Sequence, residues 1–201
     1  MLRLGWNRRW RKVITGLALI VAAMGSLEGC LNMVTSVGHA LVNVGTTTSE
    51  DRSLYTIAED FSIKSEITNI YLDEAMLLDI NTDVYVGRVM LTGAVKKAET
   101  KRKAEEIAQR VKGVREIINE IQVTTEGGIS ASIHDSFIET ELALFLLMEK
   151  GVSSIDYRWR SVNAVVYFIG RASSREELDK VLSLAREMKG VSRVVSHVRI
   201  Q

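Results

Sequence analysis

Hydrophobic periodicity predicts a helix at the start of each half of the chain beyond residue 50. In the first half, apolar side chains recur at spacings near three and four, which is the period of one helix face. These positions are Leu54, Ile57, Ala58, Phe61, Ile67 and Ile70. We therefore expect this row to face a core and the remaining positions to face water.

A β-hairpin is predicted after each of these helices. Residues 84–89 contain Gly87, where we expect the turn, and residues 159–166 contain Asn163-Ala164 at the equivalent place. Tight hairpins favour such residues in their turns, because the central positions adopt positive φ. We expect the two turns there, followed by a second helix and a third strand in each half.

The two halves are copies of one unit. Residues 89–93 match 166–170, and residues 112–114 match 189–191, both at an offset of 77. Across the first helices the offset is 75, and we place the two extra residues of the second copy at the first hairpin. The sequence therefore predicts an α+β protein with two tandem units of α-β-β-α-β order, each with two helices packed on a three-stranded mixed sheet.

The first helix of the second copy is expected to begin near residue 136. Ser136-x-x-Glu139 has the form of a capping box, in which the Ser and Glu side chains bond the first N–H groups of a helix. Asp135 or Ser136 is then the cap. His134-Asp135-Ser136 contains the residue types of a nucleophile triad, but consecutive residues at a helix start point in different directions and cannot form the relay.

The same helix carries a second row of apolar side chains. The core positions Ile63, Ile67 and Ile70 of the first copy correspond to Ile138, Leu142 and Phe145. Ser62, Asn69 and Asp73 correspond instead to Phe137, Leu144 and Met148, and Leu147 is adjacent. At 100° per residue these three lie close to one line along the helix. Such an extra apolar face is buried against something, and the other copy, a protein partner and lipid are the three candidates.

The first thirty residues predict an export signal. Five basic side chains precede residue 13, an uncharged apolar run covers residues 13–25, and Leu27-Glu28-Gly29-Cys30 follows. A basic start, a short apolar run and small residues before a cleavage site are typical of secretory signals. The run is too short for a comfortable transmembrane helix. The alternative is an uncleaved amphiphilic anchor in which Cys30 is a small buried residue.

Leu27-Glu28-Gly29-Cys30 resembles a bacterial lipobox, from which Glu28 departs because a small residue is usual there. The resemblance implies cleavage before Cys30, which would carry a covalent diacylglycerol and an N-acyl chain. Leu31 follows the cysteine where an Asp commonly retains lipoproteins in the inner membrane. The resemblance therefore implies an anchor in the outer membrane, on its periplasmic face.

The repeated unit resembles the BON domain, on the strength of its element order, Gly93 or Gly170 at the end of the second strand, and the Lys-Gly-Val steps at 112–114 and 189–191. With the lipobox, the chain is similar to the dual-BON outer-membrane lipoproteins. The expected parts are a signal peptide at 1–29, a lipidated N-terminus and tether at 30–49, BON domains at 50–125 and 133–201, and a linker at 126–132.

That family resemblance implies envelope integrity, binding of anionic phospholipid and a role at the division site. It also places lipid contact on the first helix of the second domain, with an aromatic residue where Phe137 stands. We therefore expect Phe137, Leu144, Leu147 and Met148 to bind lipid. The alternative is a periplasmic interaction module whose apolar row docks an envelope protein or the first BON domain.

Composition and charge exclude other classes of function. The formal net charge is +1 and there is one cysteine, which argues against a nucleic-acid-binding field and against a disulfide or cysteine-zinc framework. His39, His134 and His197 have no metal-ligand spacing. We expect a non-enzymatic protein without metal or cofactor. The cations that could attract anionic lipid are Arg158, Arg160, Arg171 and Arg175.

Overall fold

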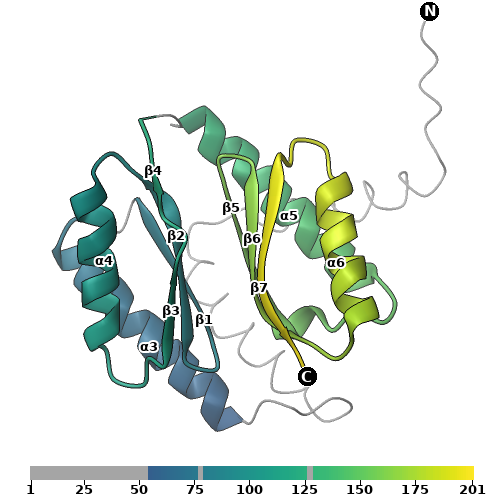
Figure 1. Ribbon diagram of the computed structural model, residues 1–201, viewed down its shortest axis with the longest axis horizontal. Helices are drawn as coiled ribbons and strands as arrows, with labels where there is room; N and C mark the ends of the chain where they lie inside the picture. Colours follow the sequence, from purple (N-terminus) through teal and green to yellow (C-terminus); the bar gives the residue numbers. More distant parts are fainter. Residues whose placement is uncertain (1–53, 77–78, 126–128) are drawn as a thin grey trace, which may run out of the picture. The chain divides into compact units, whose positions relative to one another are not determined.

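The computed structural model describes residues 54–76, 79–125 and 129–201, and it describes no side chains for 129–131 (Figure 1). Arg52–Gln201 forms a compact unit by itself. The predicted signal peptide, the tether and Cys30 lie outside the described residues, so what is said of them stays a prediction from the sequence. Among the described helices, none combines the length and the apolar character that crossing a membrane requires.

Each copy folds as one helix, a hairpin, a second helix and a last strand. The first copy consists of α3 (Leu54–Asp73), β1 (Ile80–Tyr85), β2 (Arg88–Val95), α4 (Ala98–Arg110), β3 (Glu116–Asn119) and β4 (Gln122–Val123). The second consists of α5 (Ile129–Met148), the short 3₁₀ helix η1 (Ser154–Asp156), β5 (Tyr157–Val162), β6 (Val165–Ala172), α6 (Arg175–Glu187) and β7 (Arg193–Ile200). The predicted α-β-β-α-β order is confirmed in both copies.

Both sheets are mixed, with the second hairpin strand in the centre. β2 pairs antiparallel with β1 and parallel with β3 and β4. β6 pairs antiparallel with β5 and parallel with β7. The last strand of the first copy is interrupted, because the Asn119 side-chain oxygen accepts the Ile121 N–H at 3.3 Å while Ile121 turns into the core.

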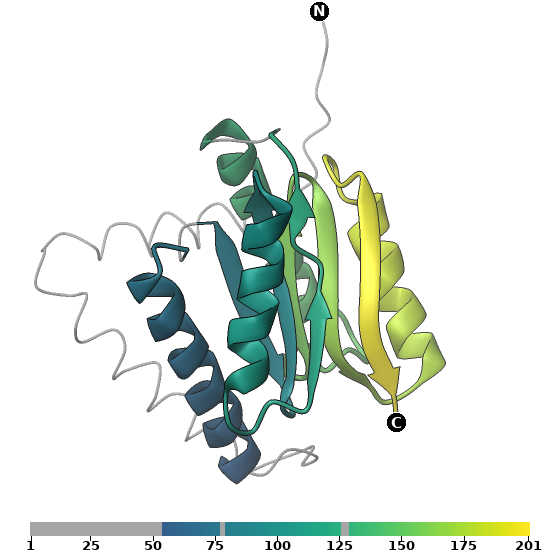
Figure 2. The ribbon, with the colours of Figure 1, turned by 60° about the vertical axis from the view of Figure 1, so that its left-hand side comes forward.

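Three buried clusters hold the described residues together. One lies between the first sheet and α3 and α4, and a second lies between the other sheet and α5 and α6 (Figures 1 and 2). The third joins the opposite faces of the two sheets and contains Tyr85, Met90, Val162, Tyr167 and Ile169. Alternation along each strand explains this arrangement, since neighbouring side chains point to opposite faces. The two domains are therefore packed sheet against sheet.

The hairpin turns lie where the sequence predicts them. Val86 and Gly87 have φ of 53° and 71°, and Asn163 and Ala164 have φ of 49° and 63°, as two-residue type I′ turns require. Since β1 and β5 are 77 residues apart at their starts and α3 and α5 are 75 apart, the extra residues of the second copy lie before the hairpin. They belong to the connection that contains η1, and the predicted position at the hairpin is wrong.

Neither glycine ends its strand, contrary to the prediction, because β2 continues to Val95 and β6 to Ala172. A Cβ at Gly93 would lie 2.0 Å from the Asp79 carbonyl oxygen, and one at Gly170 would lie 2.1 Å from that of Asp156. Both positions therefore require a residue without a side chain, because the carbonyl group just before the first hairpin strand occupies the space that a Cβ would need.

The rotation of the first helices differs from the expected one. Leu54 and Phe61 are 83 % and 72 % exposed, and α3 turns Asp60, Ile63, Ile67 and Tyr71 toward the sheet instead. In the second copy α5 is rotated in the same sense, so that Leu146 is buried in the core and Phe145, which was expected there, is exposed. A buried carboxylate on each core face explains the rotation, and its role is described next.

Candidate functional site

One buried carboxylate fastens the first helix of each copy to its own hairpin. Asp60 accepts the N–H groups of Val86 and Gly87, both at 2.8 Å. Asp135, the equivalent residue, accepts those of Asn163 at 2.7 Å and Ala164 at 2.9 Å. The carboxylates thereby satisfy turn donors that the I′ geometry leaves without a partner. The core-facing side of α5 is thus fixed relative to β5 and β6.

This role overturns the predicted capping box. α5 begins at Ile129, so Ser136 and Glu139 lie within the helix. Ser136 Oγ donates to the Ser132 carbonyl at 2.9 Å, and Asp135 accepts the Ser161 hydroxyl at 2.6 Å. The three adjacent residues 134–136 therefore have separate partners and form no hydrogen-bonded relay. In the described part of the chain no group of His, Cys, Asp and Glu side chains is arranged to hold a metal ion.

The second apolar row lies on the outer face of α5. We call Phe137, Leu144, Leu147 and Met148 the outer stripe; their exposed fractions lie between 41 % and 73 %. Ile138, Leu142 and Leu146 on the opposite side of the helix are buried. The stripe therefore points away from the sheet, as expected for residues about half a turn from the core face. The alternative in which the first domain covers it is wrong, because the outer stripe is exposed and the domains meet through their sheets.

Two further exposed apolar residues extend this surface. Ile133 lies one helical turn before Phe137 and is exposed, and its spacing of four from Phe137 was a signal that the sequence analysis missed. Ile155 is exposed on η1, which packs against α5. Since η1 belongs to the connection after α5, only the fold brings Ile155 close to this helix. The outer surface of the second domain is thus more apolar than its helix pattern alone predicts.

The acidic residues near the stripe differ in how far they are neutralised. Glu139 pairs with Arg160 Nη1 at 3.2 Å and accepts the Ser161 N–H at 2.9 Å. Glu149 pairs with Lys180 Nζ at 3.0 Å. Within the described residues Glu141 has no ion pair. Glu141 is therefore the acid whose charge opposes an anionic surface most directly.

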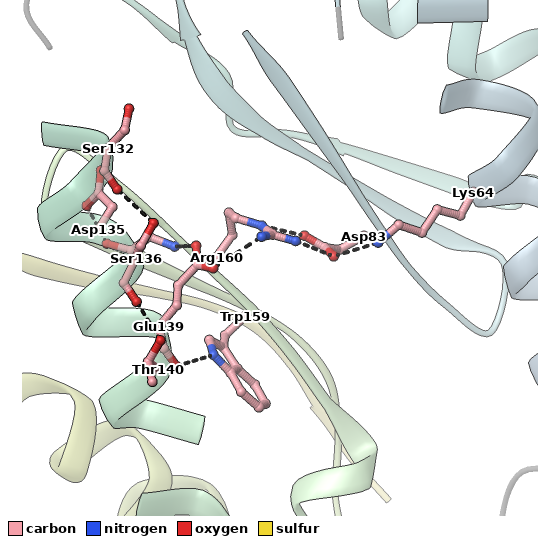
Figure 3. Close-up of polar contacts among 10 residues, drawn as sticks. Lys64, Asp83, Ser132, Asp135, Ser136, Glu139, Thr140, Trp159 and Arg160 are labelled. Atoms are coloured by element: carbon pink, nitrogen blue, oxygen red, sulfur yellow. Dashed lines mark hydrogen bonds and ion pairs between the residues drawn. The ribbon is translucent and has the colours of Figure 1, made fainter. Parts of the chain in front are cut away.

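A groove of about 560 Å³ runs along one flank of the stripe. Its α5 side includes Ser136, Thr140 and Ala143, and its β5 side includes Arg158 and Trp159. The Trp159 indole N–H donates to the Glu139 carbonyl at 3.3 Å, which joins the two sides (Figure 3). Of the four candidate cations, this groove brings Arg158 and Arg160 to α5, whereas Arg171 and Arg175 are not among its lining residues.

Arg160 is already engaged by two carboxylates. Its Nε and Nη2 atoms lie 3.2 and 3.1 Å from the two Asp83 oxygens, and Lys64 lies 3.4 Å from Asp83 (Figure 3). Burial lowers the pKa of Arg160, but the charges and hydrogen bonds of Asp83 and Glu139 outweigh burial and hold this pKa above its usual value. Burial raises the pKa of Glu139 despite its bonds to Ser161 and Arg160. Arg160 therefore joins α5 to the first domain, whereas Arg158 lines the groove and its Nη1 donates to the carbonyl oxygens of Ile155 and Tyr157 at 3.0 and 2.8 Å.

A second set of contacts between the domains surrounds Glu116. It accepts hydrogen bonds from Arg88 Nε at 2.8 Å and from Arg199 Nη2 at 2.7 Å. Arg88 Nη2 also donates to the His197 carbonyl at 3.0 Å. The hydrogen bond from Arg88, followed by the charges of Arg88, Arg199 and His197, lowers the pKa of Glu116 below its usual value near 4.5.

This lowered pKa predicts a pH dependence. Because the folded state binds the Glu116 proton more weakly than the unfolded state does, its contribution to stability is present above about pH 5 and is lost as the pH falls through the lowered pKa. We expect Glu116→Gln to lower Tm modestly at pH 7 and to lower it less as the pH falls. Thermal unfolding of the wild type and of Glu116→Gln between pH 3 and pH 7 measures this difference in Tm. A difference that does not change with pH would contradict the assignment.

Comparison with known proteins identifies the family. The BON domain family model matches residues 59–125 and 134–201. The chain belongs to the BON-domain family. The two matches fall on the two copies described above, and the predicted resemblance to dual-BON proteins is confirmed.

Several relatives of this BON-domain protein share most of its length. It is 32 % identical over 144 residues to an uncharacterized protein of the gshII 5' region of Anaplasma centrale, covering 71 % of this chain and 95 % of that one. It is 25 % identical over 182 residues to the outer membrane lipoprotein DolP of Haemophilus influenzae, covering 89 % and 92 %. It is 28 % identical over 146 residues to the 21 kDa hemolysin of Actinobacillus pleuropneumoniae, covering 73 % and 69 %.

Among solved structures, CdsD, a structural protein of the type III secretion system of Chlamydia trachomatis, aligns with a TM-score of 0.30 at 10 % identity. The alignment covers 70 % of this chain and 92 % of that one.

Proposed function

We propose that this BON-domain protein is an outer-membrane lipoprotein that binds anionic phospholipid through the outer stripe of α5. It is anchored on the periplasmic face by acyl chains on Cys30 and supports envelope integrity, including at the division site. Its similarity to a protein named as an outer membrane lipoprotein supports the compartment. The mechanism is contact rather than catalysis.

The exposure of the outer stripe carries this proposal. Four large apolar side chains lie together on one outer helix face, whereas the equivalent positions of α3 are Ser62, Asn69, Leu72 and Asp73. Burying such a side chain completely contributes about 1.5–3 kcal/mol. Amphipathic helices bind at the headgroup boundary by this means, with help from basic side chains and anionic lipid. Arg158 lines the groove on the α5 side of β5, and its charge supports this proposal.

Vesicle co-sedimentation tests the lipid specificity. All three buried clusters lie within Arg52–Gln201, so this part can be used without the predicted anchor. We expect it to pellet with vesicles that contain phosphatidylglycerol and to pellet less with phosphatidylcholine vesicles or at high salt, because charge attraction is screened. Absence of binding to both kinds of vesicle would contradict the proposal.

Glu141→Gln is expected to strengthen binding to phosphatidylglycerol vesicles by a few-fold. It removes the acid near the stripe that no described cation neutralises, and one charge near an anionic membrane is worth about 1 kcal/mol. Glu66 is the equivalent residue of α3 and is also exposed, so Glu66→Gln is the matched control with the same change in net charge. Equal effects of the two substitutions would contradict a local role of α5.

The anchor is tested separately by mass spectrometry of the mature protein. We expect an N-terminus at Cys30 that carries a diacylglyceryl group and an N-acyl chain, because Leu27-Glu28-Gly29-Cys30 supplies the lipobox. Stable attachment to a bilayer needs more than one acyl chain, which this modification provides. An unmodified Cys30 would contradict the proposed anchor without bearing on the stripe.

A further inference from the structure

Equivalent residues of the two domains contact one another. Asp83 and Arg160 are 77 positions apart, which is the repeat offset, and they form two hydrogen bonds. Glu120 and His197 are also 77 apart, and Glu120 Oε1 lies 2.8 Å from His197 Nε2. A residue meets its own equivalent only near the axis of a two-fold interface. The two BON domains are therefore related by a pseudo-two-fold axis within the chain.

Strand register shows where this axis runs. Asp83 lies opposite Met90, and Met90 lies opposite Ile118. In the other sheet Arg160 lies opposite Tyr167, and Tyr167 lies opposite Val195. The two rows are equivalent at the offset of 77, and both are represented in the buried cluster between the sheets by Met90, Ile118, Tyr167 and Val195. The axis therefore passes near these rows, with the Asp83–Arg160 contact at one end and the Glu120–His197 contact two residues beyond Ile118 and Val195 at the other.

The charges at the axis are opposite in the two copies. An acid in the first domain, Asp83 or Glu120, meets a base or histidine in the second, Arg160 or His197. The helix partners are reversed as well, since Lys64 of α3 corresponds to Glu139 of α5. The result is an alternating series of charges, Lys64, Asp83, Arg160 and Glu139 (Figure 3). Reversal at all these positions makes the two inner sheet faces complementary rather than identical.

We infer that these charges restrict the inner sheet face of each BON domain to a partner of the other type. Two first domains paired in the same way would place Asp83 against Asp83 at a position that is 4 % exposed. Two second domains would place Arg160 against Arg160. Like charges brought together out of water are strongly disfavoured, so the axis residues act as specificity-determining residues.

This pairing rule also sets which surfaces the protein presents. Each pair contains one layer of α3 and α4 and one layer of α5 and α6, on the outer sides of the two sheets. A pair of two second domains would instead present two outer stripes. Between two copies of the chain, only an exchange that joins a first domain to a second domain keeps the charges complementary. The pairing of the inner sheet faces does not depend on what the outer stripe binds.

Arg160→Asp recreates within the chain the carboxylate pair of a first–first contact. We expect it to lower Tm by about 5 °C more than Arg160→Gln, since both remove the guanidinium and only one adds a like charge. Asp83→Asn should lower Tm in the wild-type chain and raise it in the Arg160→Asp chain. This change of sign is the decisive result. A loss of Tm from Asp83→Asn in both backgrounds would overturn the inference.

The second axis pair gives a readout if Arg160→Asp does not fold. Glu120 and His197 are partly exposed, with side-chain exposures of 30 % and 26 %, so their variants are expected to fold. His197→Glu should lower Tm by about 2–4 °C, and adding Glu120→Lys should restore it because an opposite pair is formed again. Failure of the double variant to recover would overturn the inference for this pair.

Discussion

Asp135→Ala is expected to lower the free energy of unfolding by about 3 kcal/mol or more, because each buried donor left without an acceptor costs about 1–3 kcal/mol. Three donors lose their acceptor at once: the N–H groups of Asn163 and Ala164 and the hydroxyl of Ser161. Chemical denaturation of residues 52–201 measures the change. The same substitution of Asp60, which accepts the two turn N–H groups of the first copy, should also lower the free energy of unfolding.

Asp179→Ala is the matched control. Asp179 is an exposed residue of α6, and such surface substitutions usually change stability by less than about 0.5 kcal/mol. A loss of less than about 1 kcal/mol for Asp135→Ala would contradict the account, because the penalty for several unsatisfied buried groups is larger than that.

Phe137→Glu is expected to weaken vesicle binding at least tenfold. Phe137 is 69 % exposed in the free protein, so most of its apolar surface is available for burial in a bilayer. Loss of this side chain alone removes about 1.5–3 kcal/mol of binding free energy if it is fully buried in lipid. A change of about 1.4 kcal/mol corresponds to a factor of ten in affinity. The added carboxylate then repels anionic headgroups. Because Phe137 makes no part of the buried clusters, we expect Tm to change little.

Local patterns predict the elements well for a physical reason. The period of apolar positions reports the helix or strand itself, and positive-φ residues such as Gly87 and Asn163 report the turns. The outer stripe was found in the same way, since Phe137 and Leu144 replace polar residues of the first copy. These features depend on neighbours in the chain, so one sequence is enough to predict them.

The rotation of α3 could not be found by the same reasoning. Hydrophobic periodicity assumes that the core face is apolar, whereas Asp60 lies on that face because the hairpin turn needs an acceptor. The apolar residue Phe61 is consequently left outside. The occurrence of Asp at 60 and again at 135, under the offset of 75, was the signal that could have indicated a shared buried role.

The residues that make the contacts between the domains could not be predicted from the sequence. Asp83 and Arg160 are far apart along the chain, and Arg160 was expected to attract anionic lipid rather than to pair with the first domain. Their pairing depends on which sheet faces meet and in which register, and neither is determined by local periodicity. The repeat offset predicts that the two residues are equivalent, but it does not predict that equivalent residues contact each other.

The most direct test of the central claim, that the outer stripe of α5 binds the membrane, compares Phe137→Glu with Phe61→Glu. Phe61 lies on α3 and is 72 % exposed, close to the 69 % of Phe137, so the two substitutions make the same chemical change at similarly exposed positions. We expect co-sedimentation of residues 52–201 with phosphatidylglycerol vesicles to fall at least tenfold for Phe137→Glu and to be unchanged for Phe61→Glu. Equal binding by Phe137→Glu and the wild type, or an equal loss for both substitutions, would contradict the claim.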